Sequence, residues 1–137
     1  MSTLNPKGVR IDACGREYEL LFTLNAIDQI QDTTGQLLPE VMLEIANVKD
    51  PNNISTLKMV LAILMNDYVE RMQDPFFSSV QHPELIPVTE KQVGYFVTEA
   101  NWGAMIDAVL TAYGYSMPDP EDDDGEESDP NAESGSN

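Results

Sequence analysis

The chain has 137 residues, a length that suits one domain with a single hydrophobic core. It carries 24 acidic residues against seven Lys and Arg, a formal net charge of −17 at pH 7. Direct binding to nucleic-acid phosphates or to an anionic membrane is therefore disfavoured by charge repulsion. The single cysteine, Cys14, cannot form an intrachain disulfide, and no apolar segment is typical of a secretion signal or a membrane span. We expect a protein of the reducing cytoplasm.

The acidic residues are concentrated towards the C-terminus. Nine of them lie in the last 22 residues, where no basic residue occurs, and residues 1–115 keep 15 acids and seven bases. From residue 117 onward the composition is dominated by Asp, Glu, Ser, Gly, Pro and Asn. Such a composition cannot bury enough apolar surface to offset the loss of chain entropy on folding. We expect a folded domain over 1–116 and a disordered acidic tail over 117–137.

The first predicted element is a β-hairpin over 8–22, because apolar and polar residues alternate along both halves of this segment. Cys14-Gly15 is the expected turn. A four-residue loop ending at Arg16 is the alternative, because Cys is unfavourable where a turn needs a positive φ. A two-residue loop predicts the cross-strand pairs Val9–Leu20, Arg10–Glu19, Ile11–Tyr18 and Asp12–Glu17.

Two short helices are predicted next. Thr23 or Asn25 can cap the first, and the Thr-Thr-Gly of 33–35 should end it. The second covers 39–47 and has a proline in its first turn, where a missing N–H group costs nothing. The apolar residues expected to face inward are Leu24, Ile27 and Ile30 in the first helix, and Leu38, Val41, Met42 and Ile45 in the second.

The longest apolar-periodic segment is 54–72, which contains neither Gly nor Pro, and we expect it to be the central helix. Its predicted buried stripe consists of Leu57, Leu61, Leu64, Tyr68 and Met72, flanked by Val60, Met65 and Val69. Met59 and Ile63 fall on the opposite side, among polar positions. Either they contact a partner protein, or a neighbouring helix of the same domain covers them.

The segment 73–88 contains three prolines, so it can be neither a helix interior nor a central strand. This predicted loop is unusually apolar, with Phe76, Phe77, Val80, Leu85, Ile86 and Val88. These side chains either fold back onto the core or form an exposed adhesive surface. The candidate partner-binding residues of the chain are therefore Met59, Ile63, Phe76 and Phe77.

Two more helices are predicted after the loop. Thr89 followed by Gln92 matches a capping box, so the first should begin at Glu90. The second should restart at Asn101 and end at Gly114. The expected apolar sides are Val93, Phe96, Val97 and Ala100 in the first, and Trp102, Met105, Ile106, Val109, Leu110 and Tyr113 in the second. The predicted fold class is α+β, a small N-terminal antiparallel hairpin followed by a bundle of about five helices.

No catalytic, cofactor-binding or metal-binding motif is found in the sequence. His82 is the single histidine and lies in the proline-rich loop. We interpret it as an ordinary surface residue, because general acid–base catalysis needs an orienting partner and a pocket. We expect a protein that is not an enzyme and binds no cofactor.

Three segments carry a family resemblance: GREYEL at 15–20 running into LNAIDQI at 24–30, VTEKQVG at 88–94, and AVLTAYG at 108–114. The last is followed by Met117-Pro118 and by an acidic tail that contains DPNA at 129–132. In this pattern of apolar and turn residues the chain resembles the tail assembly chaperones of long-tailed phages and prophages of Gram-positive bacteria. That family is related to a tail protein of gene transfer agents.

The resemblance implies an α+β domain with an N-terminal hairpin followed by helices, in agreement with the predicted elements. It also implies a non-enzymatic helper that binds the tape measure protein and helps to recruit tail tube subunits. Such a helper works in the host bacterial cytoplasm and is not expected in the mature virion. Two alternatives are a structural tail subunit, such as a tube or connector protein, and an acidic inhibitor that mimics nucleic acid.

Overall fold

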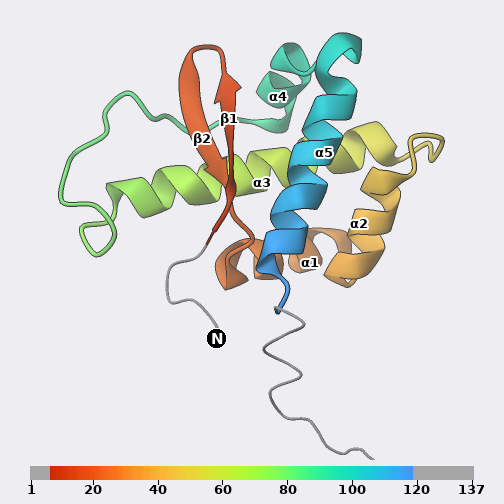
Figure 1. Ribbon diagram of the computed structural model, residues 1–137, viewed down its shortest axis with the longest axis horizontal. Helices are drawn as coiled ribbons and strands as arrows, with labels where there is room; N and C mark the ends of the chain where they lie inside the picture. Colours follow the sequence, from red (N-terminus) through yellow and green to blue (C-terminus); the bar gives the residue numbers. More distant parts are fainter. Residues whose placement is uncertain (1–6, 119–137) are drawn as a thin grey trace, which may run out of the picture.

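A computed structural model describes residues 7–118 of the chain. This part consists of a two-stranded antiparallel hairpin followed by five helices, which confirms the predicted α+β fold (Figure 1). The elements are β1 (Val9–Ala13), β2 (Arg16–Leu20), α1 (Leu24–Thr34), α2 (Leu38–Ala46), α3 (Asn53–Gln73), α4 (Glu90–Phe96) and α5 (Glu99–Ser116). The disordered tail predicted over 117–137 lies outside the described residues, except for its first two.

The hairpin has the register predicted for a two-residue loop, with Ile11 opposite Tyr18 and Ala13 opposite Arg16. Cys14 and Gly15 have φ angles of 55° and 82°, the positive values that a tight two-residue turn between antiparallel strands requires. The Gly15 N–H donates a hydrogen bond to Asp12 Oδ1 at 2.9 Å. The four-residue alternative is therefore wrong, and the register that buries the inward side chains outweighs the strain of a positive φ at Cys14.

Helix α3 runs across the middle of the molecule and contacts β2, α1, α2 and α4 (Figure 1). The predicted stripe is confirmed, because Leu57, Leu61 and Leu64 are buried and the two residues at its C-terminal end, Tyr68 and Met72, are half-buried. The central position predicted for this helix is therefore correct.

The opposite side of α3 is also buried. Met59 and Ile63 keep only 8% and 7% of their surface exposed, and both belong to the hydrophobic core cluster. Because other elements pack around α3 on several sides, these two residues do not form an exposed partner-binding face. That interpretation is wrong, and the alternative, burial by neighbouring elements of the same domain, is correct.

A buried asparagine joins three helices at the N-terminal end of α3. The Asn53 side-chain amide is 1% exposed, and its Nδ2 donates to the carbonyl oxygens of Glu44 at 3.1 Å and Ile45 at 2.6 Å, near the end of α2. Its Oδ1 accepts a hydrogen bond from Trp102 Nε1 in α5 at 3.0 Å. Because every polar atom of this amide has a partner, its burial carries little desolvation cost, and α2, α3 and α5 are held in register.

The first two helices follow the predicted ends, with one correction. Thr23 caps α1 by accepting a hydrogen bond from the Ala26 N–H at 3.1 Å, and Gly35, with a φ of 69°, ends it. Leu24, expected to face inward, is 83% exposed, because it is the first residue of the helix and the buried positions are Ala26 and Ile30. All four residues predicted to be inward in α2 are buried.

The last two helices need corrections at their boundary. The capping box of Thr89 and Gln92 is confirmed at the start of α4. Helix α5 begins at Glu99, two residues before the predicted start, because Asn101 Oδ1 accepts from the Thr98 N–H at 2.7 Å. Ala100 therefore belongs to α5 and is exposed, and Gly114 does not end this helix, which continues to Ser116. Gly114 takes no positive φ, so it leaves the helix unbroken.

We expect Leu64→Ala in α3 and Ile106→Ala in α5 each to lower the free energy of unfolding by about 2–5 kcal/mol, because both create cavities in the core. Leu24→Ala removes the same side chain from an exposed position and should change it by no more than about 0.5 kcal/mol. Denaturant unfolding followed by circular dichroism measures all three. Equal midpoints for Leu64→Ala and Leu24→Ala would contradict the assignment of buried faces.

Candidate partner-binding surfaces

The loop between α3 and α4 both packs onto the core and exposes apolar side chains, so each of the two predicted outcomes holds for part of it. Leu85 is buried and Val88 is half-buried against the core cluster. Phe76, Phe77 and Val80 are exposed. Of the four candidate partner-binding residues, the structure leaves only the two phenylalanines on the surface.

The two phenylalanines form one compact aromatic feature. Phe76 and Phe77 are 84% and 62% exposed, and their rings pack edge to face with centroids 4.8 Å apart and an interplanar angle of 80°. Asp74 orders the turn beneath them: its Oδ1 accepts from the Phe76 N–H at 2.9 Å, and its carbonyl oxygen accepts from the Phe77 N–H at 3.0 Å. We call residues 74–80 the Phe76–Phe77 turn.

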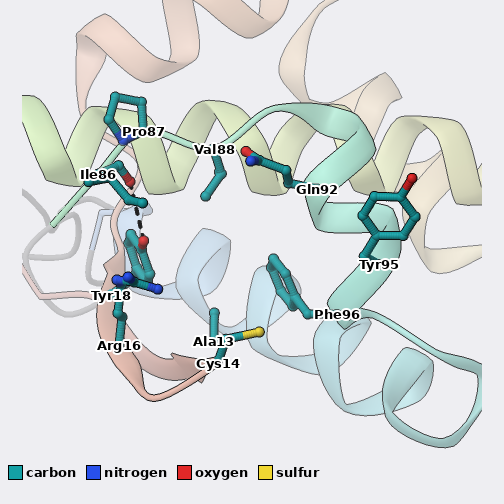
Figure 2. A pocket seen from close by; sticks show the side chains of 10 residues that line it. All are labelled: Ala13, Cys14, Arg16, Tyr18, Ile86, Pro87, Val88, Gln92, Tyr95 and Phe96. Carbon is teal, nitrogen blue, oxygen red and sulfur yellow. Dashed lines mark hydrogen bonds between the residues drawn. The ribbon is translucent and has the colours of Figure 1, made fainter. Parts of the chain in front are cut away.

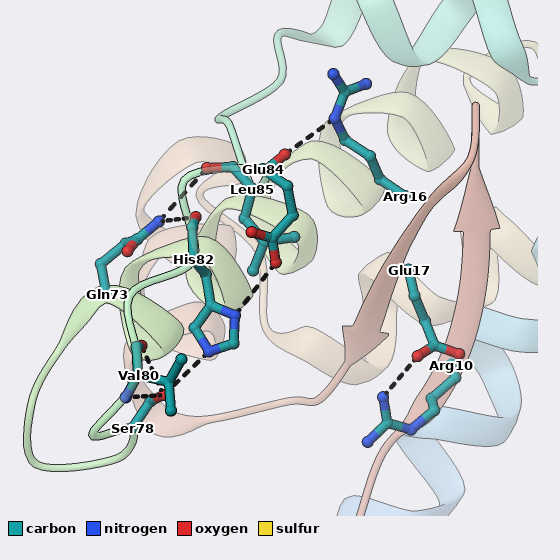
Figure 3. Close-up of polar contacts among 9 residues, drawn as sticks. All are labelled: Arg10, Arg16, Glu17, Gln73, Ser78, Val80, His82, Glu84 and Leu85. Carbon is teal, nitrogen blue, oxygen red and sulfur yellow. Dashed lines mark hydrogen bonds and ion pairs between the residues drawn. The ribbon is translucent and has the colours of Figure 1, made fainter.

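The C-terminal half of the loop is fixed to the body by polar contacts. Asn66 of α3 makes two hydrogen bonds to the backbone of Val88, through Oδ1 at 2.7 Å and Nδ2 at 2.8 Å. From the hairpin, Arg16 Nε donates to the Glu84 carbonyl at 3.0 Å and the Tyr18 hydroxyl donates to the Ile86 carbonyl at 3.3 Å (Figures 2 and 3). Burial raises the pKa of Tyr18, which keeps its hydroxyl protonated as a donor.

His82 has partners that sequence reasoning missed. Its Nε2 lies 3.0 Å from Ser78 Oγ and its Nδ1 lies 3.2 Å from Glu84 Oε2 (Figure 3). His82 is half-buried and has an orienting partner in Glu84, which the sequence interpretation did not foresee. The spacing Ser-x3-His-x-Glu within a turn-rich loop is the signal that could have indicated this contact.

Ser78, His82 and Glu84 contact one another in the series serine, histidine, acid found in hydrolase triads, but the surroundings of the serine favour a structural role. Ser78 Oγ lies 3.3 Å from the Val80 nitrogen and 3.0 Å from the Val80 carbonyl oxygen. The cavity beside the network is lined by His82 and Glu84 but not by Ser78. The hydroxyl is thus part of the turn, and the network joins the Phe76–Phe77 turn to the anchored half of the loop.

A second apolar feature is a groove of about 270 Å³ between the hairpin turn, the loop and α4 (Figure 2). Ala13 and Tyr18 contribute from the hairpin, and Val88 and Phe96 from the loop and α4. Although the chain is strongly acidic, no Asp or Glu lines this groove, and the one charged residue at it is Arg16. We call it the hairpin groove.

Three further observations concern the class of protein. Within residues 7–118, no group of three or more His, Cys, Asp or Glu residues is placed to hold a metal ion. In the same part of the chain, no helix combines the length and the apolar character needed to cross a membrane. Comparison of the chain with protein-family models, with curated proteins and with solved structures finds no match.

The hydrogen bonds of Glu84 predict a pH-dependent loop. The pKa of Glu84 lies below its ordinary value of 4.5, first because its own backbone N–H donates to the carboxylate and then because His82 does. A lowered pKa in the folded state means that the contact is present above pH 4.5 and is lost as the pH falls through the lowered pKa. Protection of the amides of residues 78–85, measured by NMR as the exchange rate relative to the intrinsic rate at the same pH, should therefore be lower at pH 3 than at pH 6.

The variant Glu84→Gln should show the low protection of the loop already at pH 6, whereas Glu90→Gln, an exposed glutamate of α4, should behave as wild type. If loop exchange in Glu84→Gln at pH 6 equals that of the wild type, the network does not order the loop.

Proposed function

We propose that this protein is a phage tail assembly chaperone that binds the tape measure protein and helps to recruit tail tube subunits. It acts in the host bacterial cytoplasm and leaves the tail before the virion is mature. The observation that carries this proposal is the Phe76–Phe77 turn, an ordered and exposed aromatic pair on an otherwise acidic protein. The sequence resemblance supplies the identity of the partner.

The aromatic pair has the properties of a binding anchor. A phenylalanine buries about 150–250 Å² when it is covered, and aromatic residues are common among the few positions that dominate binding energy. The backbone of the turn is already fixed by Asp74 and by the contacts of Ser78 and Val80. A partner therefore does not have to order this turn when it binds, which lowers the entropic cost of association.

A tape measure protein suits such an anchor. It is a long helical chain whose apolar faces are unpaired until the tail tube surrounds it, so it needs temporary cover. Two adjacent phenylalanines can enter the apolar stripe of one helix, while the net charge of −17 keeps the complex soluble. An interface built around two side chains is small, and small interfaces are those of transient complexes, as departure from the tail requires.

Replacing both anchors tests the proposal. We expect Phe76→Ser/Phe77→Ser to reduce recovery of the co-expressed tape measure protein at least about tenfold in a pull-down, because hot-spot residues are lost. The melting temperature should stay within about 2 °C of wild type, since both side chains are exposed. Capture by the wild type should persist in high salt, because an apolar contact is not screened.

The matched control is Leu24→Ser/Leu43→Ser, which removes two exposed apolar side chains from α1 and α2. It should capture the tape measure protein as the wild type does. Full capture by the phenylalanine variant with an unchanged melting temperature would exclude the Phe76–Phe77 turn as the binding surface. Presence of the protein in purified particles would favour a structural tail subunit, and displacement of a basic partner by DNA would favour a nucleic-acid mimic.

A further inference from the structure

Within the part of the chain that the structure describes, the outer edge of β1 is unpaired. Among residues 7–118 the sheet has only the strands β1 and β2. In a hairpin closed by a two-residue turn, the residues flanking the turn form a hydrogen-bonded pair, and such pairs alternate along the strands. Ala13–Arg16 and Ile11–Tyr18 are therefore hydrogen-bonded pairs. The intervening residues of β1, Arg10 and Asp12, direct their backbone N–H and C=O groups outward.

The side chains of these two residues make the edge self-complementary. If a second β1 pairs antiparallel with the first about a two-fold axis at Ile11, Arg10 lies opposite Asp12 of the other copy, and Asp12 lies opposite its Arg10. Both contacts join opposite charges, and both fall at backbone pairs that exchange two hydrogen bonds. Shifting the register in either direction would place Arg10 or Asp12 opposite its own equivalent, so the charges select one register.

The outer edge of β2 lacks this property. Its outward-directed backbone groups belong to Glu17 and Glu19, the residues between its hydrogen-bonded positions. Every antiparallel register that uses those groups pairs one of these glutamates with a glutamate or leaves it beyond the end of the strand. Like charges directly opposite destabilise a sheet, so this edge is protected against pairing. Helix α3 packs against β2, and helix α5 contacts both strands but leaves Arg10 and Asp12 exposed.

The side chains of Arg10 and Asp12 can each make further hydrogen bonds to a second chain. Arg10 Nη1 lies 3.1 Å from Glu17 Oε1 on the exposed face of the hairpin, which engages one of the five donors of the guanidinium (Figure 3). Asp12 Oδ1 accepts from the Gly15 N–H, and its Oδ2 remains for an arginine of another chain. Arg10 and Asp12 are both exposed.

We infer that β1 is a self-association edge, on which a second copy of this chain pairs antiparallel about Ile11 to form a four-stranded sheet. Strands of five residues bury less than the roughly 1,200 Å² of a standard stable interface, so the dimer forms at high protein concentration. Because each chain carries a net charge of −17, screening by salt should strengthen association between low and physiological ionic strength.

Hydrogen exchange of the purified wild-type chain tests this directly and does not depend on the proposed function. The amides of Arg10 and Asp12 should exchange about tenfold more slowly at a concentration where nine-tenths of the chains are paired, because exchange then proceeds through the unpaired tenth. The amides of Glu17 and Glu19 should not change with concentration. Sedimentation gives the paired fraction. Absence of self-association at about 1 mM, or protection at Glu17 and Glu19 instead, would overturn the inference.

Charge reversal provides a second test. Arg10→Asp and Asp12→Arg should each weaken self-association about tenfold or more, and a one-to-one mixture should restore it, because each Asp then faces an Arg. Lys91→Asp and Glu90→Arg, which reverse exposed charges on α4, are the matched controls for net charge and should leave association near wild type. Unchanged association of Arg10→Asp, or equal weakening by Lys91→Asp, would count against the β1 edge. Circular dichroism establishes whether each variant is folded. If Asp12→Arg does not fold, the self-association of Arg10→Asp alone tests the inference.

Discussion

The burial of α3 on nearly every side is the constraint on which the rest of this structure depends. The hairpin, α1, α2 and α4 all contact this helix of 21 residues, and its buried side chains lie all around its circumference. Asn53 fixes its N-terminal end to α2 and α5 through an amide whose polar atoms are all paired. A helix enclosed in this way has no apolar face left for a partner, so a partner has to bind exposed apolar side chains on the elements around it, such as Phe76 and Phe77.

The loop after α3 and the hairpin meet that requirement together. Arg16 and Tyr18 bind the backbone of residues 84–86, so the hairpin holds the same segment that carries the polar network of His82. The Phe76–Phe77 turn precedes this segment along the chain, and Ile86, Pro87 and Val88 at its end line the hairpin groove. These polar contacts thus position the exposed side chains of Phe76 and Phe77. We interpret this arrangement as a preformed docking surface.

The elements that could be predicted from the sequence are those set by local chemistry. The alternation of β1 and β2 and the Cys14-Gly15 turn specify one register, and the caps at Thr23 and Thr89 depend on residues three positions away. The features that could not be predicted depend on distant parts of the chain. Burial of Met59 and Ile63 requires neighbours packed around α3, and the periodicity of one helix does not show how many neighbours it has.

The candidate site also has a part that could be predicted from the sequence and a part that depends on tertiary structure. The apolar composition of the loop indicated that Phe76 and Phe77 were exposed or buried together, but only the tertiary structure distinguishes them from Leu85, which packs on the core. The partners of His82 are close in sequence, yet their contact depends on the folded path of the loop. The continuation of α5 to Ser116 likewise shows that a glycine able to end a helix does not end it unless its φ becomes positive.

In the function that we propose, this protein keeps a tape measure protein soluble by covering its apolar helical faces. The most direct measurement is the soluble fraction of that protein, produced alone or together with this chain from the same tail gene cluster. We expect it to aggregate when produced alone and to be recovered as a soluble complex when this chain is present. A tape measure protein that is equally soluble without this chain, or remains insoluble with it, would contradict the account.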